Sequence, residues 1–421
     1  MSATAPVAGA LGAALLLALS GSARAQLTEQ AAAYVSAGVT NNALFAPDPA
    51  PYLPNNVFPD AFTIVRASVQ AAYAARRSEQ LLVYAYSGTF YAEHPEGDGQ
   101  NHDLGWRLHA TPTGRTELRA QADALYAYLN SANPLAASGA VNPQSVMVPN
   151  AVAVPPGPAS FYGLSAGATG TYQPDARYLW SESTNVNEVL RASGDLPDSF
   201  TALQSFGMQR IWGRSAFTLN FLLSYLDSSA LKAADGTMLA ANNAGGAELM
   251  AGWRHDFSAS VSGSAAAGVL VSDVFTTGEY SVQPVGEARV HYQHGFALAE
   301  AALEQTSQID PYIGQFLLTD MLSARAYLAL DRLERFHFVG YGSAQHASVI
   351  SGESLSTAFN LLVGDVGFAY QPLRVPLVAS IDYNIQDQIG HTVDAIPFSS
   401  LHRQAVLFTL TGIWRSDTGL H

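Results

Sequence analysis

The feature that most constrains this chain is a series of segments in which apolar and polar side chains alternate. From residue 31 onward the alternation returns in eighteen segments, an even number. The segments are 31–38, 62–74, 79–91, 103–111, 116–128, 160–171, 177–186, 203–212, 215–227, 247–256, 258–271, 282–293, 296–308, 320–330, 336–347, 357–369, 375–386 and 402–414. A period of two residues is typical of a β-strand with one apolar and one wet face. The pattern therefore predicts an all-β chain.

The connections between these segments alternate between short and long. The short ones follow even-numbered segments and include "ARRS", "TPTGR", "YQPDA" and "WGRS". The long ones follow odd-numbered segments, and the longest is the Pro-rich stretch 129–159. Tight turns at one end and long extracellular loops at the other are typical of an up-and-down transmembrane barrel. A soluble sandwich would mix connection lengths, and a solenoid would need a fixed repeat.

The stretch "RLHATPTGRTELRAQADALYAY", Arg107 to Tyr128, leaves the choice of helix or strand open locally. Its second half is rich in strong helix formers, and Leu118, Ala122 and Leu125 recur at helical spacing. Read at period two, the same residues give one apolar face opposite Glu117, Arg119, Gln121 and Asp123. The order of the other segments favours a hairpin with "TPTGR" as its turn.

Composition fits a wall between lipid and water. Hydrophobic residues make up 48% of the chain and charged residues only 13%, about half the usual quarter of a soluble domain. A formal charge of −14 without a Lys/Arg cluster argues against a nucleic-acid partner. With no cysteine, disulfides, thiolate metal sites and a cysteine nucleophile are excluded.

The first 25 residues resemble an export signal. The apolar core 11–19, "LGAALLLAL", is followed by Ala23-Arg24-Ala25, a small-x-small cleavage pattern. Residues 1–10 carry no Lys or Arg, so the usual basic start is missing. No later apolar run reaches the length of a membrane-spanning helix. We therefore expect a signal peptide over 1–25 and one up-and-down outer-membrane barrel of about 18 antiparallel strands over 26–421, with 129–159 as its most notable extracellular loop.

The two faces of each segment predict which side chains meet lipid and which meet water. A lipid-facing cation costs about 2–4 kcal/mol at mid-membrane, so charged side chains should point inward. The predicted lumen-lining residues are Arg107, His109, Glu117, Arg119, Asp123, Glu248, Arg254, Asp256, Glu287, Arg289, His291, Glu300, Glu304, Arg325, Asp365 and Asp382. For any single residue, an ion pair that holds the wall together is the competing explanation.

Signals for catalysis and metal binding are weak. Gly163 to Gly167 matches the G-x-S-x-G pattern, but no helix is predicted to follow it, as a nucleophile elbow requires. The run "HPEGDGQNHD" collects Glu96, Asp98 and Asp103 without the EF-hand spacing, so a solvated turn is the simpler interpretation. The 11 histidines are scattered through strands and turns. We expect no enzymatic activity, cofactor or metal.

Three stretches together resemble a known family: "YVSAGVTNNALFAPD", "FTIVRASVQAAYAARRSEQLLVYAYSGTFYAEH" and "NHDLGWRLHATPTGRTELRAQADALY". They are similar to the β-barrel porin family of exopolysaccharide gene clusters over residues 34–128. The resemblance implies an outer-membrane barrel that works with a short periplasmic polysaccharide-export protein and supplies the pore this partner lacks. It carries no substrate-binding residue over to this chain.

Four functions stay open from sequence. The first is a conduit for exopolysaccharide in the outer membrane, with lipid, a periplasmic export protein and the polysaccharide chain as partners. The second is a general solute porin, which a constriction of opposed charges or an apolar trimer patch would favour. A barrel hydrolase would need a Ser/His or Asp/His pair within hydrogen-bond distance. An adhesive barrel would place its function in the long loops.

Overall fold

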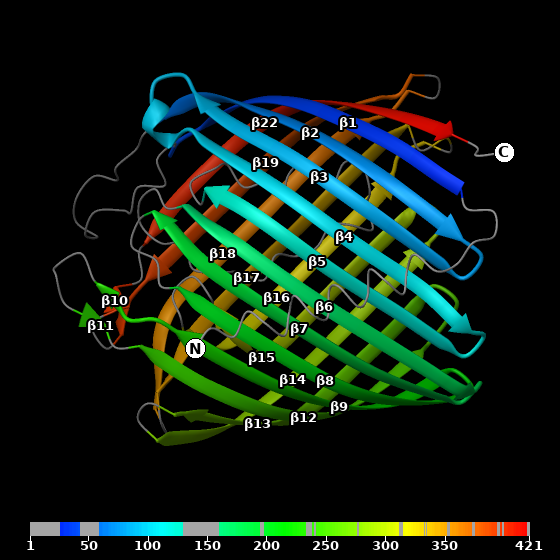
Figure 1. Cartoon of the computed structure of the whole chain (residues 1–421), viewed down its shortest axis with the longest axis vertical. Coiled ribbons are helices and arrows are strands. Elements are labelled where there is room, and N and C mark those ends of the chain that lie inside the picture. Colours follow the sequence, from blue (N-terminus) through cyan, green and yellow to red (C-terminus); the bar gives the residue numbers. More distant parts are fainter. Residues whose placement is uncertain are drawn as a thin grey trace.

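The computed structural model describes residues 26–42, 59–128, 160–193, 198–232, 238–239, 241–275, 278–310, 315–331, 333, 335–351, 354–372, 375–393, 396–397 and 400–418. Eighteen antiparallel strands form one sheet that closes on itself, because β1 pairs with both β2 and the last strand, β22. Figure 1 shows the strands crossing the barrel obliquely, as closure of a sheet requires. The all-β barrel prediction and its strand number are confirmed.

The first half of the ring runs from β1 to β9. Its strands are β1 (Gln26–Thr40), β2 (Asp60–Ala75), β3 (Ser78–Tyr91), β4 (Gly99–Thr113), β5 (Thr116–Tyr128), β6 (Ser160–Asp175), β7 (Tyr178–Ser193), β8 (Ser199–Trp212) and β9 (Ser215–Ser228). The stretch that could be helix or strand is the β4–β5 hairpin, so the period-two pattern outweighs helix propensity there.

The second half of the ring runs from β12 to β22. Its strands are β12 (Asn242–Asp256), β13 (Val261–Val274), β14 (Glu279–His294), β15 (Ala297–Asp310), β16 (Gln315–Ala329), β17 (Phe336–Ser351), β18 (Ser354–Tyr370), β19 (Leu377–Gly390) and β22 (Leu401–Thr418). Small hairpins β10–β11 (Leu231–Lys232, Met238–Leu239) and β20–β21 (Thr392–Val393, Ile396–Pro397) and the short helix η1 (Pro95–Gly97) lie in connections. Within the described part of the chain, no helix is long and apolar enough to span a membrane.

The two ends of the barrel differ in their connections. At the short-turn end, β2–β3, β4–β5, β6–β7 and β8–β9 are each joined by two residues (Figure 1). At the opposite long-loop end, several strands extend past their predicted limits, and β17 and β18 are joined by only residues 352–353 where nine residues, 348–356, were predicted as a loop. The pattern fails there because Ala347 to Ile350 are buried on both faces, so polar and apolar side chains no longer alternate.

At β13 the strand begins later than predicted. The eleventh segment was predicted from Ser258, but β13 begins at Val261. The hydroxyl of Ser258 accepts the backbone N–H groups of Ser260 and Val261, which closes a turn and uses the donors that a strand would need. The predicted signal peptide 1–25 and the predicted extracellular loop 129–159 lie outside the described residues.

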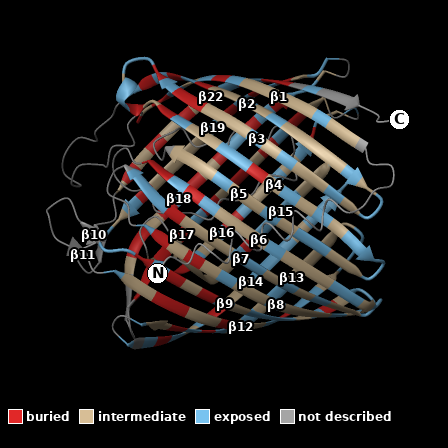
Figure 2. Cartoon of the chain, in the orientation of Figure 1, coloured by how far each residue is buried: buried red, intermediate tan, exposed pale blue. Residues whose placement is uncertain are grey.

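The outer face of the wall is apolar. Large side chains such as Leu249, Leu303, Leu322 and Phe408 are 46–61% exposed and alternate with inward-facing neighbours. Figure 2 shows that fully buried residues gather toward the long-loop end, while the inner wall near the short turns stays partly exposed. The lumen is therefore open toward the short turns and filled toward the long loops.

Near the long loops, part of the lumen is occupied by the ends of strands that belong to the barrel wall. Phe316 and Leu318 of β16 share a face with the exposed Leu322, and the pairing of β16 with β15 and β17 has no register shift. Nevertheless Phe316 is 2% exposed and packs with Leu270 and Val285, which face inward from β13 and β14. The long-loop ends of β15–β17 therefore lean into the barrel, with their outer face against the inner face of β12–β14.

The backbone pairing of β14 with β15, here called the seam, ends before the long-loop end. This leaves β15–β17 free to lean into the barrel. These strands pair only from Gly286↔Gln305 to His294↔Ala297, whereas the flanking β13–β14 pairing continues to Glu279. Pro284, two residues past the end of the seam, has no N–H to donate to a neighbouring strand. Ser307, above the seam on β15, donates instead to the inward-facing Glu248 of β12 at 3.2 Å.

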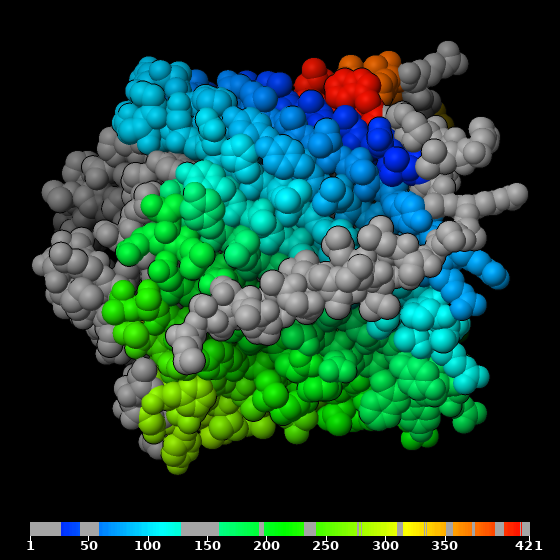
Figure 3. Space-filling view, in the orientation of Figure 1, coloured from blue at the N-terminus to red at the C-terminus, as the bar shows by residue number. Residues whose placement is uncertain are grey.

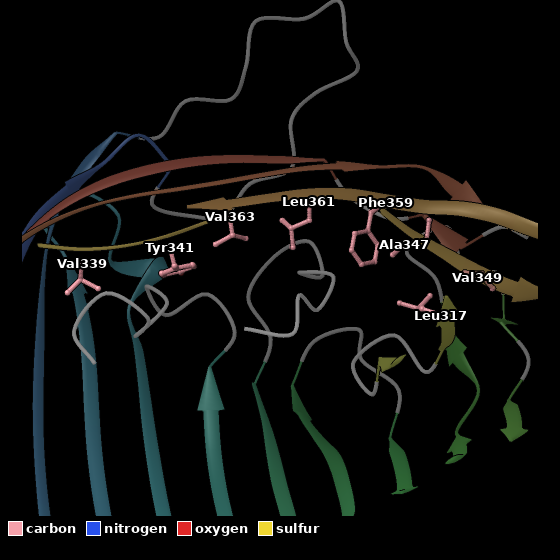
Figure 4. Packing of buried hydrophobic residues seen from close by; sticks show 9 residues of the cluster. Leu317, Val339, Tyr341, Ala347, Val349, Phe359, Leu361 and Val363 are labelled. Carbon is pink, nitrogen blue, oxygen red and sulfur yellow. The ribbon is translucent and has the colours of Figure 1, made fainter. Parts of the chain in front are cut away.

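The other face of the leaning strands belongs to the largest apolar cluster. Leu317, Ala347 and Val349 pack with Phe359 and Leu361 of β18. Figure 4 shows the labelled side chains of this cluster lying along one side of the sheet. The long-loop ends of β16 and β17 are thus held by apolar contacts on both faces.

Candidate functional site

The inner wall of β4 and β5 carries a set of paired charges. Arg107 and Asp123 lie 2.6 Å apart, and Asp123 also accepts a hydrogen bond from Ser165 of β6 at 3.3 Å. Glu117 contacts Arg119 at 2.6 Å and His109 at 3.2 Å. The strand period of two places all of these side chains on one face, because they occupy alternate positions.

A second set lies on β14, β15 and β16. Arg289 contacts Glu304 at 2.8 Å, and Glu300 contacts Arg325 at 3.0 Å. Glu300 is also 3.5 Å from His291 and 4.0 Å from Arg289, so it joins three cationic or titratable groups. The cross-strand pairs His291↔Glu300↔Arg325 put these residues in one row.

The two sets face each other. β5 and β16 are nine places apart in either direction around the ring of eighteen, which places them on opposite sides. Each set holds two arginines, two carboxylates and one histidine. With neutral histidines the formal charge of each is 2 − 2 = 0. Each set is therefore neutral in itself, while the inward-facing Glu79 and Glu287 beside the two sets add negative charge.

A cavity of about 400 Å³ lies beside the first set. Its inward-facing polar lining consists of Glu79, Arg107, His109, Arg119, Gln121, Thr169, Ser183 and Asn185. Hydroxyl and amide groups such as these both donate and accept hydrogen bonds. The surface suits a solute rich in hydroxyl groups.

The remaining predicted lumen residues lie outside both sets. Arg254 contacts Asp256 at 3.3 Å near the short turns, and Glu287 lies opposite Glu304 in the sheet. Asp365 and Asp382 face inward from β18 and β19 but are only 5% and 3% exposed. Ser380 donates a hydrogen bond to Asp382 at 2.8 Å. The predicted residues thus occupy strand positions that alternate with exposed apolar side chains, and these two aspartates are buried.

Sequence reasoning missed charged groups nearer the long loops. Arg66 of β2 faces inward with its guanidinium 5.0 Å from the ring centre of Tyr34, and Arg403 of β22 is buried at 4% exposure. The rule that charged side chains avoid lipid would also have placed Arg66 on the inner face, because Arg66 alternates with the outward Val65 and Ala67. The rule fails for Glu182, which faces outward and accepts a hydrogen bond from Gln204 at 3.0 Å.

The candidate motifs have structural roles. Ser165, the serine of the G-x-S-x-G pattern, lies within β6 and bonds Asp123. Asp98 accepts the N–H of Tyr91 at 2.7 Å, while Asp103 lies apart from it on β4. Among the described residues no group of three or more His, Asp or Glu side chains could hold a metal ion.

A row of arginines marks one side of the short-turn end. Arg76 and Arg77 lie in the β2–β3 turn, and Arg115, Arg177 and Arg214 lie in the next three short turns. All five side chains are exposed. In Figure 3 the blue, cyan and green turns of this half of the barrel project at the right-hand edge. We call these five residues the arginine arc.

No protein-family model and no curated relative matches the chain. Similar solved structures include the copper transporter OprC, at 10% identity and a TM-score of 0.46 over 94% of this chain and 82% of that one. OpdL of Pseudomonas aeruginosa is 9% identical with a TM-score of 0.43, covering 93% and 99% of the two chains. The alcaligin receptor FauA of Bordetella pertussis is 11% identical with a TM-score of 0.42, covering 91% and 76%.

Proposed function

We propose that this chain forms an outer-membrane pore for a neutral or weakly charged polysaccharide and acts with a periplasmic polysaccharide-export protein. The observation that carries the proposal is the pair of facing, internally neutralised charge sets on β4–β5 and β14–β16. A charge-selective porin would gain from opposed unpaired charges, whereas a neutral polymer gains from a wet wall that neither attracts nor repels ions strongly.

The dimensions of the barrel support a polymer. Eighteen strands leave an aqueous lumen unless something fills it. The hydroxyl and amide side chains around the cavity of about 400 Å³ can exchange hydrogen bonds with sugar hydroxyls as a chain moves past. Several weak, similar contacts suit passage better than one tight site, because the substrate must also leave.

The arginine arc is the proposed contact with the periplasmic partner. Five exposed cations on four consecutive turns stand out on a chain whose formal charge is −14. The short turns of an outer-membrane barrel face the periplasm. A partner with an acidic rim would be steered to this side of the opening by charge complementarity.

Passage also requires a change at the long-loop end. The leaning ends of β15–β17 fill part of the lumen there, so a polymer has to displace Phe316 and Leu318 from the inner face of β12–β14. The early end of the β14–β15 seam removes backbone hydrogen bonds that would otherwise resist this movement. In the proposed cycle we take this arrangement as the closed state of the exit.

The test is deletion of the gene, with staining for surface polysaccharide. The proposal expects loss of the glycan, recovery with the wild-type gene, and impaired recovery when Arg77, Arg115, Arg177 and Arg214 are all replaced by Glu. A matched variant with four Lys keeps the charge and should restore export. Normal surface glycan in the deletion strain would exclude the export role and leave the general solute porin.

A further inference from the structure

A group of polar side chains lies on the outer face of the wall, where the strand alternation places side chains that meet lipid. Glu182 and Thr184 of β7 share this face with Trp180 and Leu190, which are 49% and 37% exposed. On the neighbouring strand β8, Gln204 donates from Nε2 to Oε1 of Glu182 at 3.0 Å. The hydroxyl of Thr184 in turn donates to Oε1 of Gln204. We call Glu182, Thr184 and Gln204 the polar series.

Strand geometry gives the depth of the polar series in the membrane. At the short-turn end of the same outer face, the guanidinium carbon of Arg210 lies 5.7 Å from the ring centre of its cross-strand neighbour Tyr178. Glu182 is four residues further along β7 than Tyr178. Four residues rise about 13 Å along a strand, which is about 10 Å along the axis at the tilt usual for outer-membrane barrels. Because the apolar band is about 25 Å tall, the carboxylate of Glu182 lies at the depth of the acyl chains.

Acyl chains would leave part of the polar series without a partner. Among the described residues, nothing pairs with the second N–H of the Gln204 amide or with Oε2 of Glu182. Ionisable side chains at such depths are rare, and they pair with one another or mark a functional surface. A lipid tail offers neither a donor for the carboxylate nor an acceptor for the amide. The face therefore suits a protein partner better than it suits lipid.

The two sides of the polar series differ in shape. On one side, the stacked rings of Phe206 and Phe221 form a ridge across β8 and β9, with their centres 6.5 Å apart. An open hollow of about 490 Å³ adjoins this ridge and Glu182. On the other side, β5 and β6 present a low wall of small side chains, at the cross-strand pairs Ala120↔Ala168 and Ala122↔Ala166. A ridge and a low wall with the polar series between them have complementary shapes.

We propose that the outer face of β5–β9 is a self-association surface, on which a second copy of this chain docks within the membrane. Both copies insert in the same direction, so the two-fold axis of the pair runs parallel to the membrane normal. An axis beside Glu182 brings the ridge of each copy against the low alanine wall of the other. The proposal concerns the assembly of the barrel and does not depend on what passes through its lumen.

The same axis completes the hydrogen bonds of the polar series. Because Nε2 of Gln204 is bonded to Oε1 of Glu182, the two side chains end at one depth in the membrane. A rotation about the membrane normal preserves depth, so the amide of each copy meets the carboxylate of the other. The second N–H of each Gln204 then donates to Oε2 of the partner's Glu182. Polar contacts and small side chains are the features that hold membrane-embedded segments together.

Cross-linking through a single cysteine tests the surface directly. The chain contains no cysteine, so one introduced thiol reports on one face of the barrel. Thr184→Cys lies on the proposed surface and keeps a small polar side chain there. In outer membranes that contain the full chain, a short bismaleimide should join this variant into a covalent pair.

The opposite side of the barrel provides the matched control. β18 is nine places from β7 in the ring of eighteen, and Val366 of β18 faces outward at 49% exposure. Val366 is four residues from Tyr370 at the short-turn end, so its depth is close to that of Glu182. Val366→Cys should remain a single barrel under the same treatment.

Variants of the polar series test what holds the two copies together. In the Thr184→Cys background, Gln204→Leu should lower the yield of the covalent pair about tenfold, because the amide contacts of both copies are lost. Gln204→Glu places two carboxylates in each copy and should abolish the pair. Exchange of the two residues, Glu182→Gln with Gln204→Glu, restores one amide for each carboxylate and should recover most of the yield. Heat-modifiable gel mobility verifies that each variant is folded.

Three results would overturn the proposal. The first is an absence of covalent pairs in folded Thr184→Cys. The second is equal cross-linking of Thr184→Cys and Val366→Cys, which random collisions would produce. The third is cross-linking of Thr184→Cys to a different protein alone, which would assign the face to another partner. Conductance of each barrel should be the same in Gln204→Leu and in the wild type, so the pore function is tested separately.

Discussion

Phe316 of β16 and Gly246 of β12 meet inside the barrel, although their strands are four places apart in the ring. A methyl group built on Gly246 would lie 2.7 Å from Cζ of Phe316 and 2.9 Å from Oγ of Ser224. Gly246 thus leaves the space into which the phenyl ring fits. The contact joins the leaning ends of β15–β17 to the inner face of β12.

A methyl group at Gly246 should loosen this contact. Gly246→Ala is expected to destabilise the folded barrel by about 1–3 kcal/mol, because Phe316 is enclosed and cannot move aside. The free energy of unfolding in lipid vesicles measures the effect. Gly170→Ala is the control, since its nearest neighbour would be 3.5 Å away, an ordinary contact. Equal effects of the two substitutions would contradict the packing argument.

Removing the phenyl ring should enlarge the exit. We expect Phe316→Ala to raise single-channel conductance in planar bilayers and to lower stability by about 3–5 kcal/mol. Phe221→Ala removes an outward-facing ring of the same size and should leave conductance unchanged. An unaltered conductance in Phe316→Ala would show that the leaning strands do not limit flow.

The neutralised lumen predicts weak ion selectivity. Reversing Arg107 and Arg119 to Glu changes the β4–β5 set from 2 − 2 = 0 to 0 − 4 = −4. We expect the reversal potential in a KCl gradient to show weak cation selectivity for the wild type, because Glu79 and Glu287 lie beside the neutral sets, and strong cation selectivity in this variant. The charge-conserving Lys variants should resemble the wild type. Strong selectivity in the wild type would favour a charge-selective porin.

The β16–β17 turn should contribute a pH-dependent increment of stability. The hydrogen bond from Arg335, with support from the backbone N–H groups of Arg335 and Phe336, lowers the pKa of Asp331. A carboxyl that is more acidic when folded stabilises the fold above its unfolded pKa of about 3.9 and loses this effect as pH falls through the lower folded value.

The variant that tests this increment is Asp331→Asn. It should be less stable than the wild type at pH 7, and the difference should shrink as the pH falls below 4. Unfolding by urea at both pH values checks this expectation. A difference independent of pH would contradict the role of the ionised carboxylate.

Most of the architecture was predictable from the sequence, because a barrel wall between lipid and water imposes one simple alternation. Each of the eighteen predicted segments overlaps one strand of the closed sheet. The β4–β5 hairpin is the clearest case, since the helix formers of Arg115 to Tyr128 lie in a strand whose Glu117 and Arg119 point inward. In this hairpin the alternation imposed by lipid on one face outweighs the local helix propensity.

The leaning ends of β15–β17 could not be predicted in this way. Phe316, Leu318 and Ile350 occupy the same face as lipid-facing residues, so alternation alone assigns them to lipid. Only the tertiary contacts with Ala244, Leu270 and Val285 reverse the assignment. Pro284 is the local sequence feature that accompanies the end of the β14–β15 pairing.

The ion pairs of the lumen were hidden for a similar reason. The pairing of each luminal arginine with its carboxylate depends on the strand register. Sequence places charges on a face, and register decides which of them meet.

The most direct test of the central claim is entry of neutral oligosaccharides into liposomes that contain the Phe316→Ala barrel, in which the exit should be open. Swelling is compared for neutral gluco-oligosaccharides and for galacturonate oligomers of equal length. The account predicts that the neutral sugars enter at least as fast as the anionic ones, with Arg107→Glu/Arg119→Glu slowing only the anionic series. Exclusion of the neutral oligosaccharides while small ions pass freely would contradict a polysaccharide pore.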